Sequence, residues 1–399
     1  ALTLQTPQSF KTRFNVDVRV HSEAVAVDRA KKEVRVRETE SGREYTERYD
    51  KLILSPGARA VIPPVAGADD PRVFTLRTVE DTFRIADYMA AKGAKRAVVI
   101  GGGFVGLEMA ENLAERGVHV SLCEGAGQVM PQMDADMACF LHARLRSAGV
   151  DLRLNAKVLG FAEQGGAFTV RTEKGDLPAD FAVLAVGVAP DTALAAAAGL
   201  ATGARGALLV DEHMRTSDKD IYAVGDAVLV RNAVTGAEGA FALAGPANRQ
   251  GRIAADNVCG IPSVYRGAQG SAVLKLFDMT AAFTGLSERA AKAAGIACDK
   301  VVLFSANHAT YYPGAQNMTL KVLFRPENGE ILGAQAVGYA GTEKRIDVLA
   351  TAIRAKMTAA DLQALDLCYA PPYSSAKDPV NMAGYVIENV RAGCKQFHW

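Results

Sequence analysis

The first part of the chain is dominated by an alternation of apolar and polar residues. This period of two predicts short strands in "NVDVRV" (15–20), "EAVAVD" (23–28) and "KEVRVRE" (32–38). The following stretch, "DKLILSPGA" (50–58), is apolar enough to predict a central strand that ends at a Pro-Gly pair. The amino-terminal region is therefore expected to contain several strands in succession.

Helical spacing first becomes clear at "TVEDTFRIADYMAAKG" (78–93). Thr78 and Asp81 have the spacing of a capping box, and Gly93 is suited to end the helix. A second helix is expected to begin at a cap formed by Asp134 and to run to residue 149.

The pattern between these helices is strand, Gly-rich turn, helix and strand. It is carried by "RAVVIGGGFVGLEMAENLAERGVHVSLCEG" (96–125). The glycines have the G-x-G-x-x-G spacing, in which the turn and the helix N-terminus hold a dinucleotide pyrophosphate. A purely structural glycine turn is the alternative. The predicted dinucleotide-binding residues of this turn are Gly101, Gly103, Phe104, Val105 and Gly106.

Glu124 ends the second strand of this unit, where an acid can bind the ribose 2′-hydroxyl of NADH. The residues after it are "GAG", so no Arg or Lys follows to neutralise a 2′-phosphate. NADH is therefore expected in preference to NADPH. The apolar strand "FAVLAVG" (181–187) closes the unit, and Gly187 at its end is predicted to contribute to the cofactor site.

The pattern changes again at about residue 267. Strands are predicted at 272–277, 319–324 and 331–338, and helices at 287–294, 341–356 and 379–392, which together indicate a separate α+β domain. These changes of pattern divide the chain into four segments, 1–90, 91–207, 208–266 and 267–399.

Composition restricts the possible partners. The chain has 45 Lys and Arg against 44 Asp and Glu, a net charge of +1, which gives no support for binding nucleic acid or an anionic membrane. No apolar run reaches the ~18 residues that span a bilayer, and the first residues lack a secretory apolar core. A cytoplasmic protein is expected. The six cysteines contain no C-x-x-C pair and the six histidines no helical pair, so no metal site is predicted.

The order of motifs resembles that of the two-dinucleotide-fold flavin disulfide reductases. "DKLILSPGA" is similar to the strand that returns to their flavin domain, and "VVIGGGFVGLEMAENLAERG" is similar to their NAD(P)H turn. "TSDKDIYAVGDA" (216–227) and "ALAGPANRQGRIAADN" (242–257) resemble two further flavin-domain segments. The resemblance implies an α/β fold with two dinucleotide-binding domains and an α+β dimerisation domain. The first, FAD-binding domain is incomplete and comprises 1–90 and 208–266, the NAD(H)-binding domain is 91–207, and the carboxyl-terminal interface domain is 267–399.

The resemblance also implies an FAD site. Asp226, after Gly225, matches the aspartate that holds the flavin ribityl chain. Ala244 matches the helix N-terminus that faces the pyrimidine end of the flavin, and Pro56 and Gly57 end the returning strand.

The last third of the chain resembles one branch of this family in particular. "ATYYPGAQNMTLKVLF" (309–324) and "CYAPPYSSAKDPVNMAGYV" (368–386) are similar to the coenzyme A-disulfide reductases and their NADH-dependent persulfide reductase relatives. In that branch two tyrosines of the partner subunit reach the active site, which implies a homodimer. The matching catalytic residues are Tyr311 and Tyr369, with Tyr312 and Tyr373 as substrate-binding neighbours. A phenol can donate a proton to a thiolate leaving group. The alternative is that "YAPPYS" is a rigid turn whose tyrosines pack at the dimer interface.

One departure from the family pattern affects the expected activity. The first G-x-G-x-x-G and the redox cysteine, which the family places before the point matching Ala1, are not in this sequence, and "GCKQFHW" resembles the approach to a rhodanese domain. The expected function of the intact protein is NADH-dependent reduction, through FAD and a cysteine outside this chain, of coenzyme A disulfide, coenzyme A persulfide or a related small disulfide. The alternatives are an NADH oxidase or peroxidase of the same superfamily, or a non-catalytic NADH-binding dimerising module.

Overall fold

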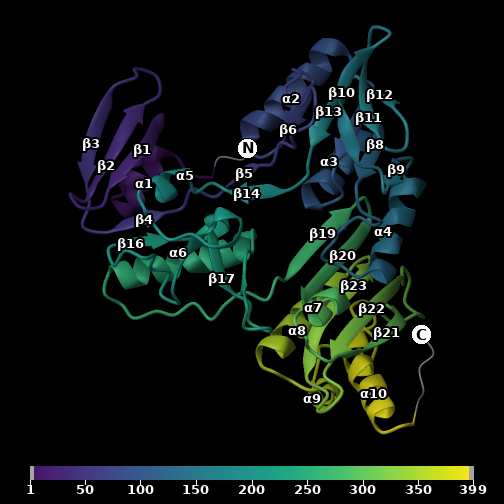
Figure 1. The fold of residues 1–399 in the computed structure, drawn as a ribbon. Helices are drawn as coiled ribbons and strands as arrows, with labels where there is room; N and C mark the ends of the chain where they lie inside the picture. Colours follow the sequence, from purple (N-terminus) through teal and green to yellow (C-terminus); the bar gives the residue numbers. More distant parts are fainter. Residues whose placement is uncertain (1–3, 395–399) are drawn as a thin grey trace. The chain divides into compact units, whose positions relative to one another are not determined.

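The computed structural model describes residues 4–394, which form two compact units (Figure 1). Within the described residues, the first unit comprises 4–58, 190–231 and 238–267. The second unit comprises 59–189, 232–237 and 268–394. The chain therefore leaves the first unit and returns to it before the carboxyl-terminal domain begins. Among the described residues, no helix combines the length and the apolar character needed to cross a bilayer.

The first unit begins with a helix and an antiparallel three-stranded sheet. Its elements are α1 (Pro7–Phe14), β1 (Ser22–Asp28), β2 (Glu33–Glu38), β3 (Glu44–Arg48), β4 (Leu52–Leu54), α5 (Ala193–Ala197), η1 (Ala204–Gly206), β15 (Leu208–Leu209), β16 (Ile221–Ala223), η2 (Gly225–Ala227), β17 (Val228–Arg231), β18 (Glu238–Gly239) and α6 (Ala244–Val258). The strands predicted at 23–28 and 32–38 are β1 and β2, which pair with each other in antiparallel register.

The prediction of a strand at 15–20 is wrong. Residues 15–20 belong to no helix or strand, and they follow α1, which the alternation did not predict. The Thr6 hydroxyl accepts a hydrogen bond from Ser9 N, and Asn15 ends the helix in the left-handed region (φ 54°). The local capping bonds, together with Pro7 at the first helical position, explain why a helix forms here.

A parallel pair of short strands forms the centre of the first unit. β4 and β16 run in the same direction with Ala223 opposite Leu54, and Val224 N donates to Leu54 O at 3.0 Å. All three residues of β16 are buried. The segments that follow β4 and β16 therefore emerge at the same carboxyl edge, which is where parallel sheets bind ligands.

The second unit contains a parallel sheet with the strand order β6-β13-β7-β8-β9. The elements of this part are β5 (Ala58–Ala60), β6 (Val73–Thr75), α2 (Val79–Lys92), β7 (Arg96–Ile100), α3 (Phe104–Glu115), β8 (His119–Glu124), α4 (Ala135–Ser147), β9 (Asp151–Leu154), β10 (Val158–Gln164), β11 (Ala167–Thr172), β12 (Leu177–Pro178), β13 (Phe181–Leu184) and β14 (Val188–Pro190). β5 and β14 form a separate two-stranded sheet.

Both faces of the parallel sheet are covered. Val99 of β7 and Val183 of β13 belong to an apolar cluster with residues of α3 and α4. The alternate residues Val98 and Ala182 belong to a second cluster with residues of the β10-β11-β12 sheet. A strand buried on both faces has to be apolar at every position, which explains the continuous apolar runs of β7 and β13.

The rest of the second unit is an antiparallel sheet with helices (Figure 1). Its strand order is β19-β20-β23-β22-β21. The elements are β19 (Ala272–Leu276), β20 (Met279–Gly285), α7 (Glu288–Ala293), β21 (Asp299–Ala306), β22 (Asn317–Phe324), β23 (Ile331–Gly338), α8 (Thr342–Arg354), α9 (Ala359–Ala364) and α10 (Pro379–Arg391). The strands and helices predicted in this region are all present, and α9 and the strands β20 and β21 are additional.

Of the two side-chain caps predicted at helix starts in the second unit, one is present and the other is not. The capping box of Thr78 and Asp81 is present at α2, and Gly93 ends that helix in the left-handed region (φ 57°). Asp134 does precede α4, but its side chain does not cap that helix. Its carboxylate instead accepts hydrogen bonds from Glu288 N at 3.0 Å and Gln335 Nε2 at 2.7 Å. The prediction of a side-chain cap was wrong because the Asp134 carboxylate binds donors from Glu288 and Gln335, which are distant in the sequence.

Candidate functional site

The Gly-rich turn lies at the carboxyl edge of the parallel sheet in the second unit. Gly101 has φ +109°, and a Cβ at this position would lie 2.3 Å from Ala185 O. A Cβ on Gly106, in the first turn of α3, would lie 1.8 Å from Gly101 O. Both positions therefore require glycine, one for its backbone conformation and both for close packing.

The space around Gly103 is open, in contrast to these two close contacts. Gly103 is the N-cap of α3, no side chain caps the helix, and a Cβ placed there would meet no atom within 4 Å. Phe104 and Val105 are the first helical residues, so their N–H groups belong to the uncapped first turn. Unpaired amides in open space fit the pyrophosphate of a dinucleotide.

Glu124 ends β8 beside this turn and is half-buried. Its two carboxylate oxygens accept hydrogen bonds from Gly102 N at 2.7 Å and from Ala126 N at 2.8 Å. The side chain therefore fixes the turn as well as placing a negative charge beside it. A 2′-phosphate at this position would face that charge.

Gly187 lies beyond the end of β13, the strand next to β7. It has φ +105°, and a Cβ there would meet no atom within 4 Å. Ala185 N donates to Ile100 O at 2.7 Å, which holds the end of β13 against the start of the glycine turn. The structure thus brings Gly187 to the same sheet edge as Gly101.

The predicted flavin residues of the first unit lie at the carboxyl edge of β4 and β16. Pro56 and Gly57 follow β4, and Asp226 lies in η2 directly after β16. Gly225 has φ +81°, and its N–H donates to Oε1 of the buried Gln250 on α6 at 2.7 Å. Sequence reasoning missed this buried glutamine, which fixes the residue before Asp226.

The N-terminus of α6 carries no side-chain cap. Its N-cap is Leu243 and its first helical residue is Ala244. The first-turn amides are therefore available to an electronegative group, such as the carbonyl-rich end of a flavin. Asp226 and α6 together fit the ribityl and pyrimidine parts of FAD, by donor and acceptor type.

The carboxyl-terminal domain brings together two of the four predicted tyrosines. The hydroxyl oxygens of Tyr311 and Tyr369 lie 2.9 Å apart, although the residues are 58 positions apart in the sequence. The hydrogen bond with Tyr311 raises the pKa of Tyr369 above its usual 10.0. Both side chains are exposed, Tyr311 at 74% and Tyr369 at 48%.

The other two predicted tyrosines are placed differently. Tyr312 packs edge-on against His308, with ring centroids 5.8 Å apart. Tyr373 is 71% exposed and does not take part in the hydroxyl pair. His308 is buried and was not singled out from the sequence, because a lone histidine carries no spacing signal.

The cysteines are all free thiols. Cys123 lies in β8 and is buried, as the apolar strand pattern predicts, and burial raises the pKa of its thiol to about 11. Cys368 is exposed next to Tyr369.

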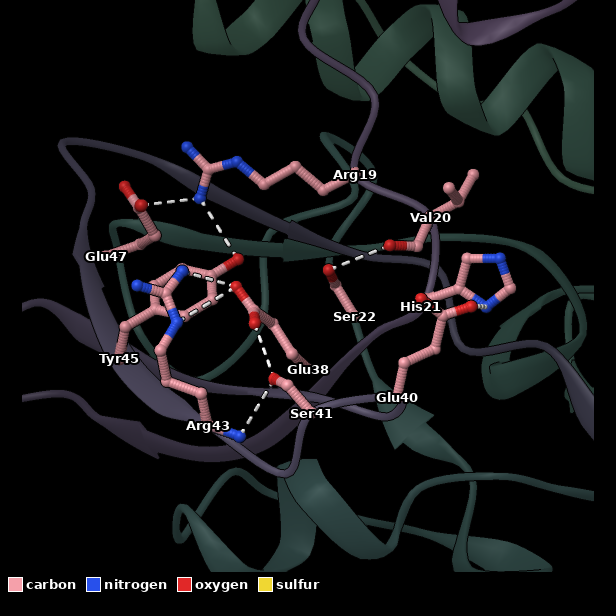
Figure 2. Close-up of a pocket in the computed structure, with 10 residues that line it drawn as sticks. All are labelled: Arg19, Val20, His21, Ser22, Glu38, Glu40, Ser41, Arg43, Tyr45 and Glu47. Atoms are coloured by element: carbon pink, nitrogen blue, oxygen red, sulfur yellow. Dashed lines mark hydrogen bonds and ion pairs between the residues drawn. The ribbon is translucent and has the colours of Figure 1, made fainter.

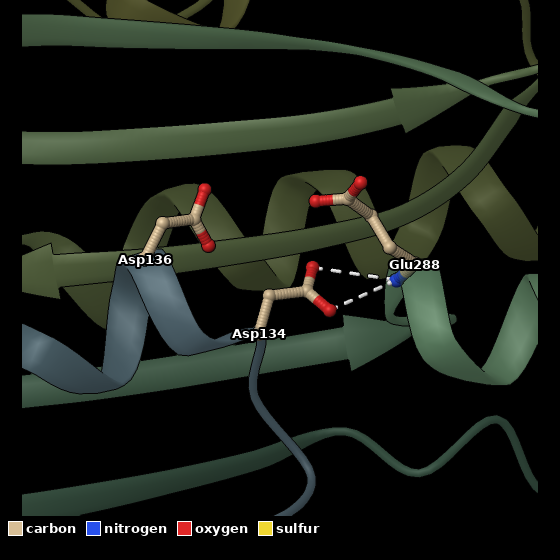
Figure 3. Close-up of side chains that lie close together, drawn as sticks. All are labelled: Asp134, Asp136 and Glu288. Atoms are coloured by element: carbon tan, nitrogen blue, oxygen red, sulfur yellow. Dashed lines mark hydrogen bonds between the residues drawn. The ribbon is translucent and has the colours of Figure 1, made fainter. Parts of the chain in front are cut away.

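Three carboxylates converge where α4 and α7 begin (Figure 3). They belong to Asp134, Asp136 and Glu288. The Lys321 ammonium group contacts all three, at 3.0 Å from Asp134 and 2.8 Å from Asp136. Lys321 is fully buried, and its ammonium, together with that of Lys300 at 2.7 Å from Glu288, supplies positive charge at this cluster.

An open cavity of about 670 Å³ lies over the sheet of β1, β2 and β3 (Figure 2). Its charged side chains pair with one another: Arg19 with Glu47, and Arg43 with Glu38. Both guanidinium groups also lie 5.6 Å from the centre of the Tyr45 ring. The cavity contains none of the predicted site residues, and we assign it no function.

The chain matches the sequence patterns of two known protein families. The pattern of the family "Pyridine nucleotide-disulphide oxidoreductase" matches residues 4–251, and that of its dimerisation domain matches residues 271–379. The chain belongs to the pyridine nucleotide-disulphide oxidoreductases. The family implies FAD and NAD(P)H as cofactors, and the dimerisation domain supports a homodimer.

Individual relatives come from several branches of this family. The chain is 34% identical to an NADH oxidase of Methanocaldococcus jannaschii (96% of this chain, 85% of the relative). It is 33% identical to a coenzyme A disulfide reductase of Staphylococcus haemolyticus (95% and 85%). A solved NAD-dependent persulfide reductase from A. fulgidus superposes with a TM-score of 0.95 at 38% identity (100% and 74%).

Proposed function

We propose that the intact protein uses NADH to reduce coenzyme A disulfide, coenzyme A persulfide or a related small disulfide, through FAD and a cysteine outside this chain. For a disulfide RSSR the balance is NADH + H⁺ + RSSR → NAD⁺ + 2 RSH. For a persulfide it is NADH + H⁺ + RSSH → NAD⁺ + RSH + H₂S. FAD, when bound, supplies the hydride-accepting and electron-transferring chemistry between the nicotinamide and the sulfur substrate.

The observation that carries this proposal is the hydroxyl pair of Tyr311 and Tyr369. A thiolate released from a disulfide needs a proton, and a phenol held by a second phenol is a suitable donor. Because the pKa of Tyr369 is raised above 10.0, its hydroxyl keeps its proton at neutral pH. Because both phenols are exposed in the single chain, we assign them to the active site of the partner subunit.

Removing either hydroxyl should slow the reduction of coenzyme A disulfide. We expect Tyr369→Phe and Tyr311→Phe each to lower kcat by about 100-fold, a typical contribution of a positioned proton donor. The KM for NADH should not change, because the pair contributes nothing to the glycine turn. Steady-state kinetics of the FAD-loaded protein with coenzyme A disulfide measure both constants.

The matched control is Tyr385→Phe, which removes the hydroxyl of another exposed tyrosine from α10 of the same domain. This variant should behave as the wild type. Wild-type kcat in both Tyr311→Phe and Tyr369→Phe would reject the catalytic assignment and leave these tyrosines as interface residues.

The preference for NADH depends on Glu124. A Cβ on Gly125 would meet no atom within 4 Å, so an arginine at this position can be accommodated. We expect Glu124→Ala combined with Gly125→Arg to lower kcat/KM for NADH by about 10- to 100-fold, since a hydrogen bond to a charged group contributes ~1.5–3 kcal/mol. The same variant should gain activity with NADPH.

The coenzyme experiment has its own control. Glu115→Ala removes an exposed acid from the far end of α3 and should leave both coenzyme constants unchanged. If the double variant keeps the wild-type ratio of NADH to NADPH activity, Glu124 does not bind the ribose.

A further inference from the structure

The two tyrosine-bearing segments meet at a buried arginine. Arg345 lies in the first turn of α8 and is only 1% exposed. Its Nη2 donates to Asn307 O at 2.9 Å, to the Ser374 hydroxyl at 3.2 Å and to Tyr373 O at 3.4 Å. Asn307 lies four residues before Tyr311, and the other two acceptors follow Tyr369 by four and five residues. One guanidinium group therefore holds both segments.

Asp378 completes this buried group. Its Oδ2 accepts a hydrogen bond from Arg345 Nη2 at 2.8 Å and from the Ser374 hydroxyl at 2.6 Å. Its Oδ1 accepts from Val380 N at 3.0 Å and so caps α10. Burial raises the pKa of Asp378. The hydrogen bonds and the arginine lower it by more than burial raises it, so the net pKa is below the usual 3.8. The carboxylate stays charged and paired at neutral pH.

The segments are also joined to each other directly. Ala309 N lies 3.0 Å from Ser374 O and 3.3 Å from Pro371 O, both of which accept its hydrogen bond. The tyrosine rings themselves are exposed and pack little against the core, so the backbone beneath them has to determine where the hydroxyls lie. Ser374 contacts Arg345 directly. Ala309 and Pro371 each lie two residues from a residue whose carbonyl accepts from Arg345, namely Asn307 and Tyr373.

A buried ion pair is a costly way to stabilise a fold. Apolar residues of similar volume often stabilise a core as well or better, because charged groups lose their hydration on burial. An arginine, unlike an apolar residue, can donate several directed hydrogen bonds to backbone carbonyls of separate segments. The arrangement is therefore better explained by positioning than by stability.

We propose that Arg345 is a positioning residue for the Tyr311–Tyr369 hydroxyl pair. It holds the segments 307–312 and 369–375 in fixed relative positions, with Ser374 and Asp378 as its supports. Its effect on catalysis rests on the proposed function, since it acts only through the two tyrosines.

The test is Arg345→Lys, which keeps the positive charge and loses the fork of donors. We expect kcat with coenzyme A disulfide to fall about 10- to 100-fold, as a displacement of catalytic groups by about 1 Å can do. In a Tyr311→Phe/Tyr369→Phe background, the same substitution should change kcat less than twofold. An equal loss in both backgrounds would overturn the proposal, because a general structural defect acts with or without the hydroxyls.

A second readout does not depend on activity. In protein labelled with ¹³C at the tyrosine Cζ, the signals of Tyr311 and Tyr369, assigned with the Phe variants, should shift in Arg345→Lys. If the signals shift but the wild type reduces no disulfide, the proposed function fails while the positioning role stands. If the signals stay at wild-type positions, the positioning role is rejected.

Two further variants complete the design. Arg354→Lys makes the same chemical change at an exposed position at the end of α8 and should alter neither kcat nor the tyrosine signals. Ser374→Ala removes one member of the network and should give a smaller loss in the same direction. This variant decides the question if Arg345→Lys does not fold, and wild-type kcat and signals in it would then contradict the proposal.

Discussion

Replacing Lys321 with methionine is expected to lower the free energy of unfolding of the second unit by about 3–5 kcal/mol. The Lys321 ammonium group is fully buried against Asp134, Asp136 and Glu288. Its removal leaves three carboxylates close together with only the Lys300 ammonium, on Glu288, as a counter-charge among the described residues. Asp134 and Asp136 flank the start of α4, whereas Glu288 and Lys321 belong to the carboxyl-terminal domain. The midpoint of urea denaturation measures the loss.

The control is an exposed lysine pair of similar geometry. Lys11 lies 2.9 Å from Asp17 with both side chains about half or more exposed, so Lys11→Met should cost less than ~1 kcal/mol. A loss of the same small size in Lys321→Met would mean that the buried cluster is not electrostatically coupled. Adding Asp136→Asn to Lys321→Met should recover part of the stability, because it removes one of the uncompensated charges.

The pH dependence of this effect follows from two opposite shifts. Burial lowers the pKa of Lys321, but its three acidic partners outweigh burial and hold the pKa above 10.5. The contribution of the ammonium is therefore complete below 10.5 and is lost only as pH rises through the folded pKa. The pKa of Glu288 is lowered against burial by Lys300 and Lys321, so its contribution is lost as pH falls well below 4.5. The difference between wild type and Lys321→Met should thus be constant from neutral pH to about pH 10. It should shrink in acid, where the crowded carboxylates of the variant take up protons more readily than those of the wild type.

Gly101→Ala should weaken NADH binding by about 10- to 100-fold, because backbone strain of ~1–3 kcal/mol is added at the glycine turn. The residue has φ +109°, and the new Cβ would lie 2.3 Å from Ala185 O, a backbone atom that cannot move alone. The turn must open to admit it, which displaces the amides of α3. Titration of the protein with NADH, followed by fluorescence, gives the affinity.

Gly251→Ala is the matched control for this substitution. Gly251 is a helical glycine of α6, and a Cβ there would meet no atom within 4 Å. This variant should bind NADH as the wild type does and be slightly more stable, since alanine favours a helix. If Gly101→Ala binds NADH with wild-type affinity, the turn is structural and the nicotinamide coenzyme binds elsewhere.

How far the sequence predicted the structure depended on whether a feature was local. The capping box at Thr78 and the strand–turn–helix at Gly101 are determined by adjacent residues, and both are present. The prediction of a strand at 15–20 failed because capping bonds just before it form a helix that ends at Asn15. The prediction of a cap by Asp134 failed because donors distant in the sequence bind its carboxylate. Alternation alone does not show whether a strand has a partner.

The candidate site shows the same limit. The motif order was enough to name Tyr311 and Tyr369, but only the fold shows that their hydroxyls meet and that Tyr312 turns to His308. Arg345 and Lys321 carry no sequence signal at all, since each is one charged residue in an otherwise ordinary element. Their roles follow from burial and from partners that lie 33 and up to 187 positions away in the sequence, at Asp378 and Asp134.

The central claim is that NADH oxidation by this protein is coupled to a small disulfide. The direct measurement is anaerobic NADH consumption by the FAD-loaded protein after addition of coenzyme A disulfide, with the thiol product counted. We predict rapid oxidation with two thiols formed per NADH. The contradicting result has two parts: neither coenzyme A disulfide nor coenzyme A persulfide causes NADH oxidation under nitrogen, and NADH is consumed rapidly once oxygen is admitted. That result would identify an oxidase.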